Sequence, residues 1–177
     1  MMFLAGLVGI IAIIAGAIYL HALIQGEAKI VAHVESRSAF KLEEVAAQRA
    51  VFTTEFEIAN ESEKPDATII DAFSRHLLPQ EQFDQATVTT RLERVGYRRQ
   101  DNYLEAFPIF GQSKETLILT LTIEAEKSIQ EIIKEIFDIK LEVYANYVSK
   151  EEFKIARWYF WTTKQELQEA IERGVVK

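Results

Sequence analysis

Hydrophobic and polar positions divide the chain into two unequal parts. Residues 1–24 are almost entirely apolar or small, and no Asp, Glu, Lys or Arg occurs before Glu27. A helix of that length would span roughly 36 Å, against a bilayer hydrocarbon core of about 30 Å. This pattern predicts one uncleaved transmembrane helix over residues 1–25.

Two other interpretations of this segment remain open. It would also suit a core helix of a soluble domain or a cleavable signal peptide. Its terminal position, length and lack of charge argue against a core helix. A signal peptide would carry a basic N-terminal region and a shorter apolar stretch, and this segment has neither.

Residues 28–177 show the two-residue period of β-strands instead. Residues 116–124 alternate almost without exception, so Leu117, Leu119 and Leu121 are predicted to point inward and Thr120 outward. The same criterion predicts about eight strands, over residues 29–35, 51–60, 67–73, 87–95, 103–110, 116–124, 139–147 and 153–161. Pro108 interrupts one of them, which indicates an edge strand or a bulge.

Two short helices interrupt the strand pattern. Ser128 and Thr163 are each followed three residues later by an acidic side chain, as in a capping box. An amphipathic helix is predicted from residue 129 to 137, and a C-terminal helix from about residue 164, with Gly174 placed to end it.

Many strands with few helices favour a mainly β fold. The prediction is an immunoglobulin-like antiparallel β-sandwich with short helices over residues 28–177, preceded by the transmembrane helix. No strand–helix–strand alternation recurs, so a parallel α/β sheet is not expected. An α+β fold with one sheet and a covering helix is the alternative.

Charge and composition then narrow the function. The net charge of −7 gives no phosphate-binding surface, so no nucleic-acid partner is expected. No Cys is present, and no metal-binding, phosphate-loop or nucleophile motif occurs. Asp71, Ser74 and His76 lie close in sequence, but a triad converges from separate elements. We therefore expect no enzyme, no cofactor and no metal site.

Two stretches are candidates for partner binding. Arg98, Arg99, Asp101 and Tyr103 lie between two predicted strands, and Arg and Tyr are frequent in interface hot spots. The alternative is a polar hairpin in which an arginine pairs with Asp101. The second candidate is Trp158, in a strand with aromatic residues on both faces. That strand either is buried on both faces or exposes one aromatic row.

Small side chains also share one face of the predicted transmembrane helix. Ala5, Gly9, Ala12 and Gly16 are spaced by four, three and four residues. Such a face permits close approach of a second helix, so it is a candidate for self-association or partner association. The alternative is that small residues are simply common in membrane helices.

Together these patterns predict a single-pass protein anchored in the lipid bilayer, acting as a protein-interaction or scaffold module in a prokaryotic envelope. Lys29, Arg37 and Lys41 follow the helix, and under the positive-inside rule they favour a cytoplasmic soluble domain. The alternative function is a domain that binds a small ligand, a lipid or saccharide, at the membrane surface.

Overall fold

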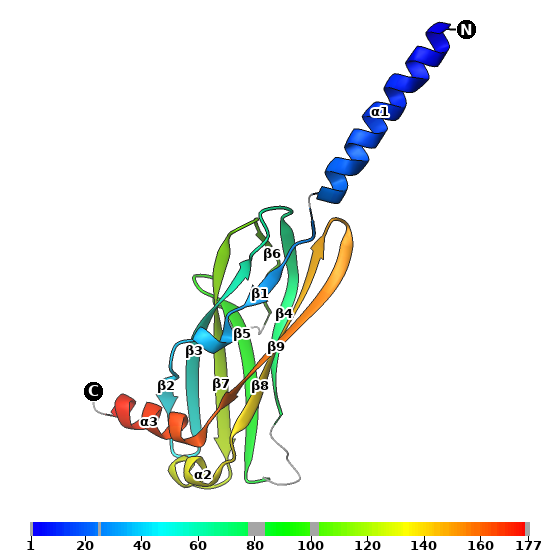
Figure 1. Ribbon diagram of the computed structural model, residues 1–177. Helices are drawn as coiled ribbons and strands as arrows, with labels where there is room; N and C mark the ends of the chain where they lie inside the picture. Colours follow the sequence, from blue (N-terminus) through cyan, green and yellow to red (C-terminus); the bar gives the residue numbers. More distant parts are fainter. Residues whose placement is uncertain (1, 25, 78–83, 100–102, 176–177) are drawn as a thin grey trace.

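The computed structural model describes residues 2–24, 26–77, 84–99 and 103–175; side chains are described for all of these except residues 2–5, 21–24 and 175. One long helix leads into an elongated domain of strands, and the last helix lies toward the far end of that domain (Figure 1). In chain order the described elements are α1 (Met2–Ile24), β1 (Ile30–Ala32), η1 (Val34–Ser36), β2 (Lys41–Val45), β3 (Arg49–Asn60), β4 (Ala67–Leu77), β5 (Ala86–Arg94), β6 (Phe107–Ile109), β7 (Lys114–Ala125), α2 (Ile129–Glu135), β8 (Ile139–Ser149), β9 (Glu152–Thr162) and α3 (Lys164–Val175).

The strands form two antiparallel sheets. The five-stranded sheet has the order β1-β3-β7-β5, with β2 also paired to β3, and the four-stranded sheet has the order β6-β4-β8-β9. Side chains from both sheets belong to one hydrophobic core, so the sheets pack face to face. A mainly β antiparallel fold with a few short helices is therefore confirmed.

The centre of the core follows the predicted alternation. Leu117, Leu119 and Leu121 on β7 are fully buried, and β7 pairs with β3 over eleven positions. On β3, Phe52 and Phe56 also lie inside. Alternate residues of these strands point into the same space, which excludes water from the area between the sheets.

The outward face of β7 departs from the prediction. Thr120 is only 4% exposed, and Ile118 is buried as well. Arg98 follows β5 and forms an ion pair with Glu43 of β2, while Arg98 and Thr120 line the same cleft. Long polar side chains from both flanks therefore cover this part of the sheet, so the prediction of a solvated threonine face was wrong at Thr120.

The helices lie at the end of the domain farthest from α1 (Figure 1). α2 begins after Ser128, whose side chain makes no capping hydrogen bond, so the first predicted capping box does not form. At α3 the hydroxyl of Thr163 accepts a hydrogen bond from the backbone N–H of Glu166 at 3.2 Å, as a capping residue should. α3 packs on β2 and α2.

Several strand predictions changed at their boundaries. β2 was not predicted, because its five residues include only two apolar positions. β6 lies at the end of its sheet, as Pro108 indicated. β9 is the other end strand of this sheet. α3 does not cover its outer face, and every second side chain from Phe153 to Trp161 is exposed there.

The connector after α1 is held against the domain. The carboxylate of Glu27 accepts from Lys154 at 2.6 Å, Lys29 pairs with Glu61 at 2.6 Å, and Ala28 is buried. Every described side chain of α1, over residues 6–20, is exposed. Among the residues that the structure describes, no candidate membrane-spanning helix is found.

Candidate interaction site

The outer face of the four-stranded sheet exposes an unusual amount of apolar surface. Along β9, four alternate side chains are more than half exposed: Phe153 (59%), Ile155 (65%), Tyr159 (56%) and Trp161 (56%). A contiguous exposed apolar patch is a common mark of an interaction surface. We call this row, together with Arg157, the β9 row.

The neighbouring strands extend the β9 row across the sheet. Phe73 of β4 lies opposite Tyr144 of β8, which lies opposite Arg157 of β9. The rings of Phe73 and Tyr144 are stacked, with centroids 4.9 Å apart and planes 5° from parallel. Cross-strand pairs of this kind stabilise a sheet face and hold its side chains in one orientation.

A buried carboxylate organises the charges on this face. Glu142 of β8 is 3% exposed. It accepts a hydrogen bond from the Tyr144 hydroxyl at 2.7 Å and another from Arg75 Nε at 2.9 Å, and Lys140 lies 3.7 Å away. The Tyr144 hydroxyl, and then Arg75, lower the pKa of Glu142 below its ordinary value. Both hydrogen bonds reach Oε2 of Glu142, and the Lys140 ammonium lies nearest to Oε1.

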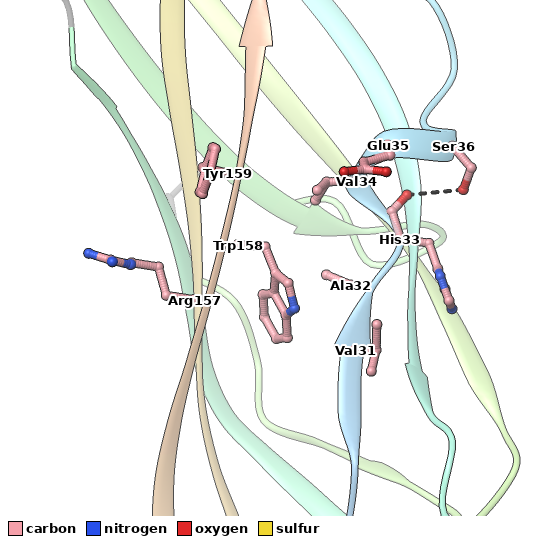
Figure 2. Close-up of a pocket in the computed structure, with 9 residues that line it drawn as sticks. All are labelled: Val31, Ala32, His33, Val34, Glu35, Ser36, Arg157, Trp158 and Tyr159. Carbon is pink, nitrogen blue, oxygen red and sulfur yellow. Dashed lines mark hydrogen bonds between the residues drawn. The ribbon is translucent and has the colours of Figure 1, made fainter.

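A cleft of about 570 Å³ separates the β9 row from the other sheet. Figure 2 shows Trp158 directed into the space between β9 and β1, while Arg157 and Tyr159 point away from it. The opposite wall is the β1–η1 segment, including Ala32 and Val34. Trp158 is half-buried and packs against the hydrophobic core, so it forms part of the cleft without closing it.

The arginine-rich stretch lies on the other sheet. Arg98 donates to the carboxylate of Glu43 at 2.8 and 3.2 Å and to Glu93 at 3.3 Å. Glu93 also accepts from the backbone N–H of Arg99 at 2.9 Å. Arg98 lowers the pKa of Glu43 by donating to it. These contacts hold the Arg98 side chain across the outer face of the five-stranded sheet.

The structure therefore does not bring the predicted binding residues together. Trp158 lines the cleft beside β9, whereas Arg98 lines a polar cleft of about 560 Å³ over the five-stranded sheet. Tyr103 is exposed, with the Arg99 guanidinium 5.7 Å from its ring centroid. Asp101 lies outside the described residues.

The small-residue face of α1 is uncovered where the structure describes it. A Cβ added at Gly9 or Gly16 would have no atom within 4 Å, and Ala12 is exposed. The side chain of Ala5 lies outside the described part. Association through this face stays a prediction.

The cleft wall formed by β1 and η1 was missed from the sequence. Val31, His33 and Glu35 come more than 120 residues before Trp158, and no local pattern relates the two segments. One signal was present for the β9 row, because apolar residues on both faces of the last strand exceed what one short terminal helix can cover. Among the described residues, no group of three or more His, Asp or Glu is placed to hold a metal ion.

Comparisons with known proteins give no family. No protein-family model matches the chain, and no curated protein matches it. Similar solved structures include the GAE domain of GGA2p from Saccharomyces cerevisiae, 13% identical over 71% of this chain and 87% of that one, with a TM-score of 0.36. A protein from Archaeoglobus fulgidus is 7% identical over 77% and 94%, with a TM-score of 0.37.

The Iho670 flagellar-like filament is 9% identical over 91% of this chain and 97% of that one, with a TM-score of 0.25. All three scores are below 0.5, so no argument about function rests on these structures.

Proposed function

We propose that this chain is a single-pass membrane-anchored protein whose immunoglobulin-like β-sandwich binds another protein through the outer face of the four-stranded sheet. The observation that carries the proposal is the β9 row, in which four large apolar side chains are more than half exposed. Placing such a row in contact with a partner removes apolar area from water.

The anchor is supported by the chemistry of α1. The helix has 23 residues with no acidic side chain in its first turn, and its described side chains are exposed along their whole run. A helix that is apolar on all sides is unfavourable in water and favourable in a bilayer. The connector contacts at Glu27 and Lys29 would then hold the domain close to the membrane surface.

The shape of the domain supports a lateral binding surface. β8 and β9 run along its long axis, from the end near α1 to the end that carries α2 and α3 (Figure 1). With α1 in a bilayer, the β9 row would face sideways, toward a neighbouring protein at the same membrane. The basic residues after α1 favour the cytoplasmic side, and a prokaryotic envelope remains the proposed setting.

Site-specific photocrosslinking in the intact membrane tests this proposal. A benzophenone amino acid placed at Ile155 or Tyr159 should give a discrete adduct whose partner is identified by mass spectrometry. The matched control position is Glu55, exposed on the outer face of the other sheet. The adduct should be lost on adding Trp161→Ser to the same chain. Equal adducts from Glu55 and Ile155, or none from Ile155, would contradict protein binding at this face.

A second candidate is binding of a small polar ligand such as a saccharide. It is favoured by the polar cleft under Arg98, where the Thr120 hydroxyl has no hydrogen-bond partner among the described residues. Arg98, which covers this cleft, is already paired with Glu43 and Glu93, and this weakens the case for a ligand there. Chemical-shift changes at Thr120 and Thr122 on titration with a saccharide panel, absent at Tyr159, would favour this function.

A further inference from the structure

β9 presents a long free edge. It has 11 residues and pairs only with β8 among the described strands. Alternate residues of an edge strand point their N–H and C=O groups away from the neighbouring strand. Native sheets usually shorten, bend or cover such an edge, because it invites pairing with another strand.

Side chains contact this edge near both of its ends, and β1 and η1 approach it across the cleft. Near its start, Lys154 pairs with Glu27 of the connector at 2.6 Å. Near its end, Arg37 donates to the backbone carbonyl of Trp161 at 3.4 Å. Between these contacts lie residues 155–160, of which Arg157, Trp158 and Tyr159 line the cleft. At about 3.3 Å per residue, this segment offers an edge of roughly 20 Å.

The cleft gives room for one set of side chains of an added strand. A strand paired with β9 would alternate its side chains between the cleft and the outer face, as β9 does. Those directed inward would meet Trp158, with Ala32 and Val34 beyond it (Figure 2). A volume of about 570 Å³ bordered by these groups suits two or three small apolar side chains.

The outer face specifies the other set. A residue opposite Arg157 would point outward beside this guanidinium, and its neighbours two positions away would lie opposite Ile155 and Tyr159. Among its described residues, the face carries three cations, Arg75, Lys140 and Arg157, against Asp71 and Glu142. The net charge of the whole chain is −7. Opposite charges across a strand pair are favourable, so the complementary residue is a carboxylate flanked by apolar side chains.

A second copy of the chain fits this edge less well. Two β9 strands could pair in antiparallel fashion, in the register that overlaps their full length. Phe153 would then lie opposite Trp161 of the other copy, and Arg157 would lie opposite its counterpart. Like charges directly opposite one another destabilise a strand pair. The charge pattern therefore favours a different protein.

We propose that residues 155–160 of β9 bind an extended segment of a partner protein by strand addition, with a partner carboxylate opposite Arg157 and apolar residues two positions to either side. This inference rests on the proposed function, and it adds the binding mode and the sequence character of the partner. Backbone hydrogen bonds would supply affinity, and Arg157 with the cleft would supply selectivity.

The probe is a fluorescein-labelled peptide, Thr-Val-Ile-Val-Glu-Val-Ile-Thr, added to the full chain in nanodiscs. Two versions carry N-methyl groups, one on the valines and one on the Ile-Glu-Ile set, which block opposite edges of the same strand. Strand addition predicts that one version loses at least about tenfold in affinity while the other binds normally. Alternate amides of residues 155–160 should also gain protection from hydrogen exchange.

Charge reversal supplies the second arm. Arg157→Glu should weaken binding of the Glu peptide about tenfold and favour a peptide with Lys in place of Glu. Lys41→Glu, on the other sheet, is the matched control and should change neither. Equal binding of both N-methylated peptides, no response to Arg157→Glu, or self-association through β9 that the peptide does not compete with would each overturn the inference.

These outcomes are separable from failure of the proposed function. If the β9 row is crosslinked to a partner in membranes but the chain does not bind the peptide, strand addition is contradicted and protein binding at this face is retained. Absence of any adduct from the β9 row would remove the function itself.

Discussion

Arg37 and Glu166 form a bidentate ion pair, with N–O distances of 2.7 and 2.8 Å, between residues 129 positions apart in the chain. The Arg37 guanidinium also lies over the rings of Phe160, 4.6 Å from the centroid, and Phe40, 5.0 Å away. One side chain thus joins the segment before β2, the end of β9 and the start of α3. Through its hydrogen bond to the Trp161 carbonyl, it also contacts the edge of β9 near the end of that strand.

Arg37→Met should destabilise the domain by about 3 kcal/mol, because Glu166 is left largely buried without its partner. The side chains of Arg37 and Glu166 are only 12% and 21% exposed. Urea unfolding of the full chain in micelles, followed by Trp fluorescence, measures the change. The double variant Arg37→Met with Glu166→Leu should recover part of the loss.

The matched control is the exposed pair Lys114–Glu57, at 2.6 Å. Lys114→Met should cost no more than about 1 kcal/mol, as is usual for surface ion pairs. Equal losses from Lys114→Met and Arg37→Met would show that Arg37 acts as an ordinary surface charge.

Two adjacent residues of β7 should respond differently to substitution. Leu119→Ala should cost about 2 to 5 kcal/mol, because it removes a fully buried side chain and leaves a cavity. Thr120→Val keeps the shape of a buried side chain whose hydroxyl has no partner among the described residues, so it should be neutral or stabilise by up to about 1 kcal/mol. The same urea unfolding measures both.

A large loss from Thr120→Val would show that the hydroxyl is bonded, and it would strengthen the case for a polar ligand in that cleft. A small loss from Leu119→Ala would remove β7 from the centre of the core.

The stability of the folded domain should decrease as pH falls, because His76 becomes protonated. Burial lowers the pKa of His76 below 6.5, although a backbone hydrogen bond with Val88 partly opposes this. The unfolded chain therefore takes up the proton first as pH falls. The stabilisation is complete above about pH 6.5 and is lost as pH drops through the folded pKa.

The carboxylates act in a lower pH window. Glu43 and Glu142 have pKa values below 4.5, so their contribution is present above about pH 4.5 and is lost below it. The thermal midpoint of the unmodified chain should decrease as pH is lowered from about 7.5 to 5. In His76→Gln the midpoint should change less over the same range. The same slope in both chains would assign the effect to another group.

The small-residue face of α1 gives a prediction within the membrane. If α1 is the anchor, Gly9→Leu and Gly16→Leu should weaken association of α1 with a second helix, because a bulky side chain prevents close backbone approach. A membrane two-hybrid assay measures this, with Leu7→Ala as the control. Equal effects of all three substitutions would leave no reason to assign association to this face.

The sequence alone determined the elements that depend on local periodicity. The alternation from Thr116 to Glu124 is a property of neighbouring residues, and it identified β7 and the inward face of the core. The apolar run before Glu27 likewise identified α1 as a long helix. These features follow from the geometry of a single element, so no distant contact is needed to infer them.

Tertiary structure decided what covers each face. Thr120 has the pattern of an exposed residue, but side chains from β2 and the segment after β5 bury it. The β9 row has the pattern of a core strand, but it is exposed, because α3 packs against β2 and α2 instead. The cleft beside Trp158 needs β1 and β9 at adjoining sheet edges. Burial depends on which distant segments meet in the fold. The two-residue period of a strand tells which side chains share a face, but it does not tell which segment covers that face.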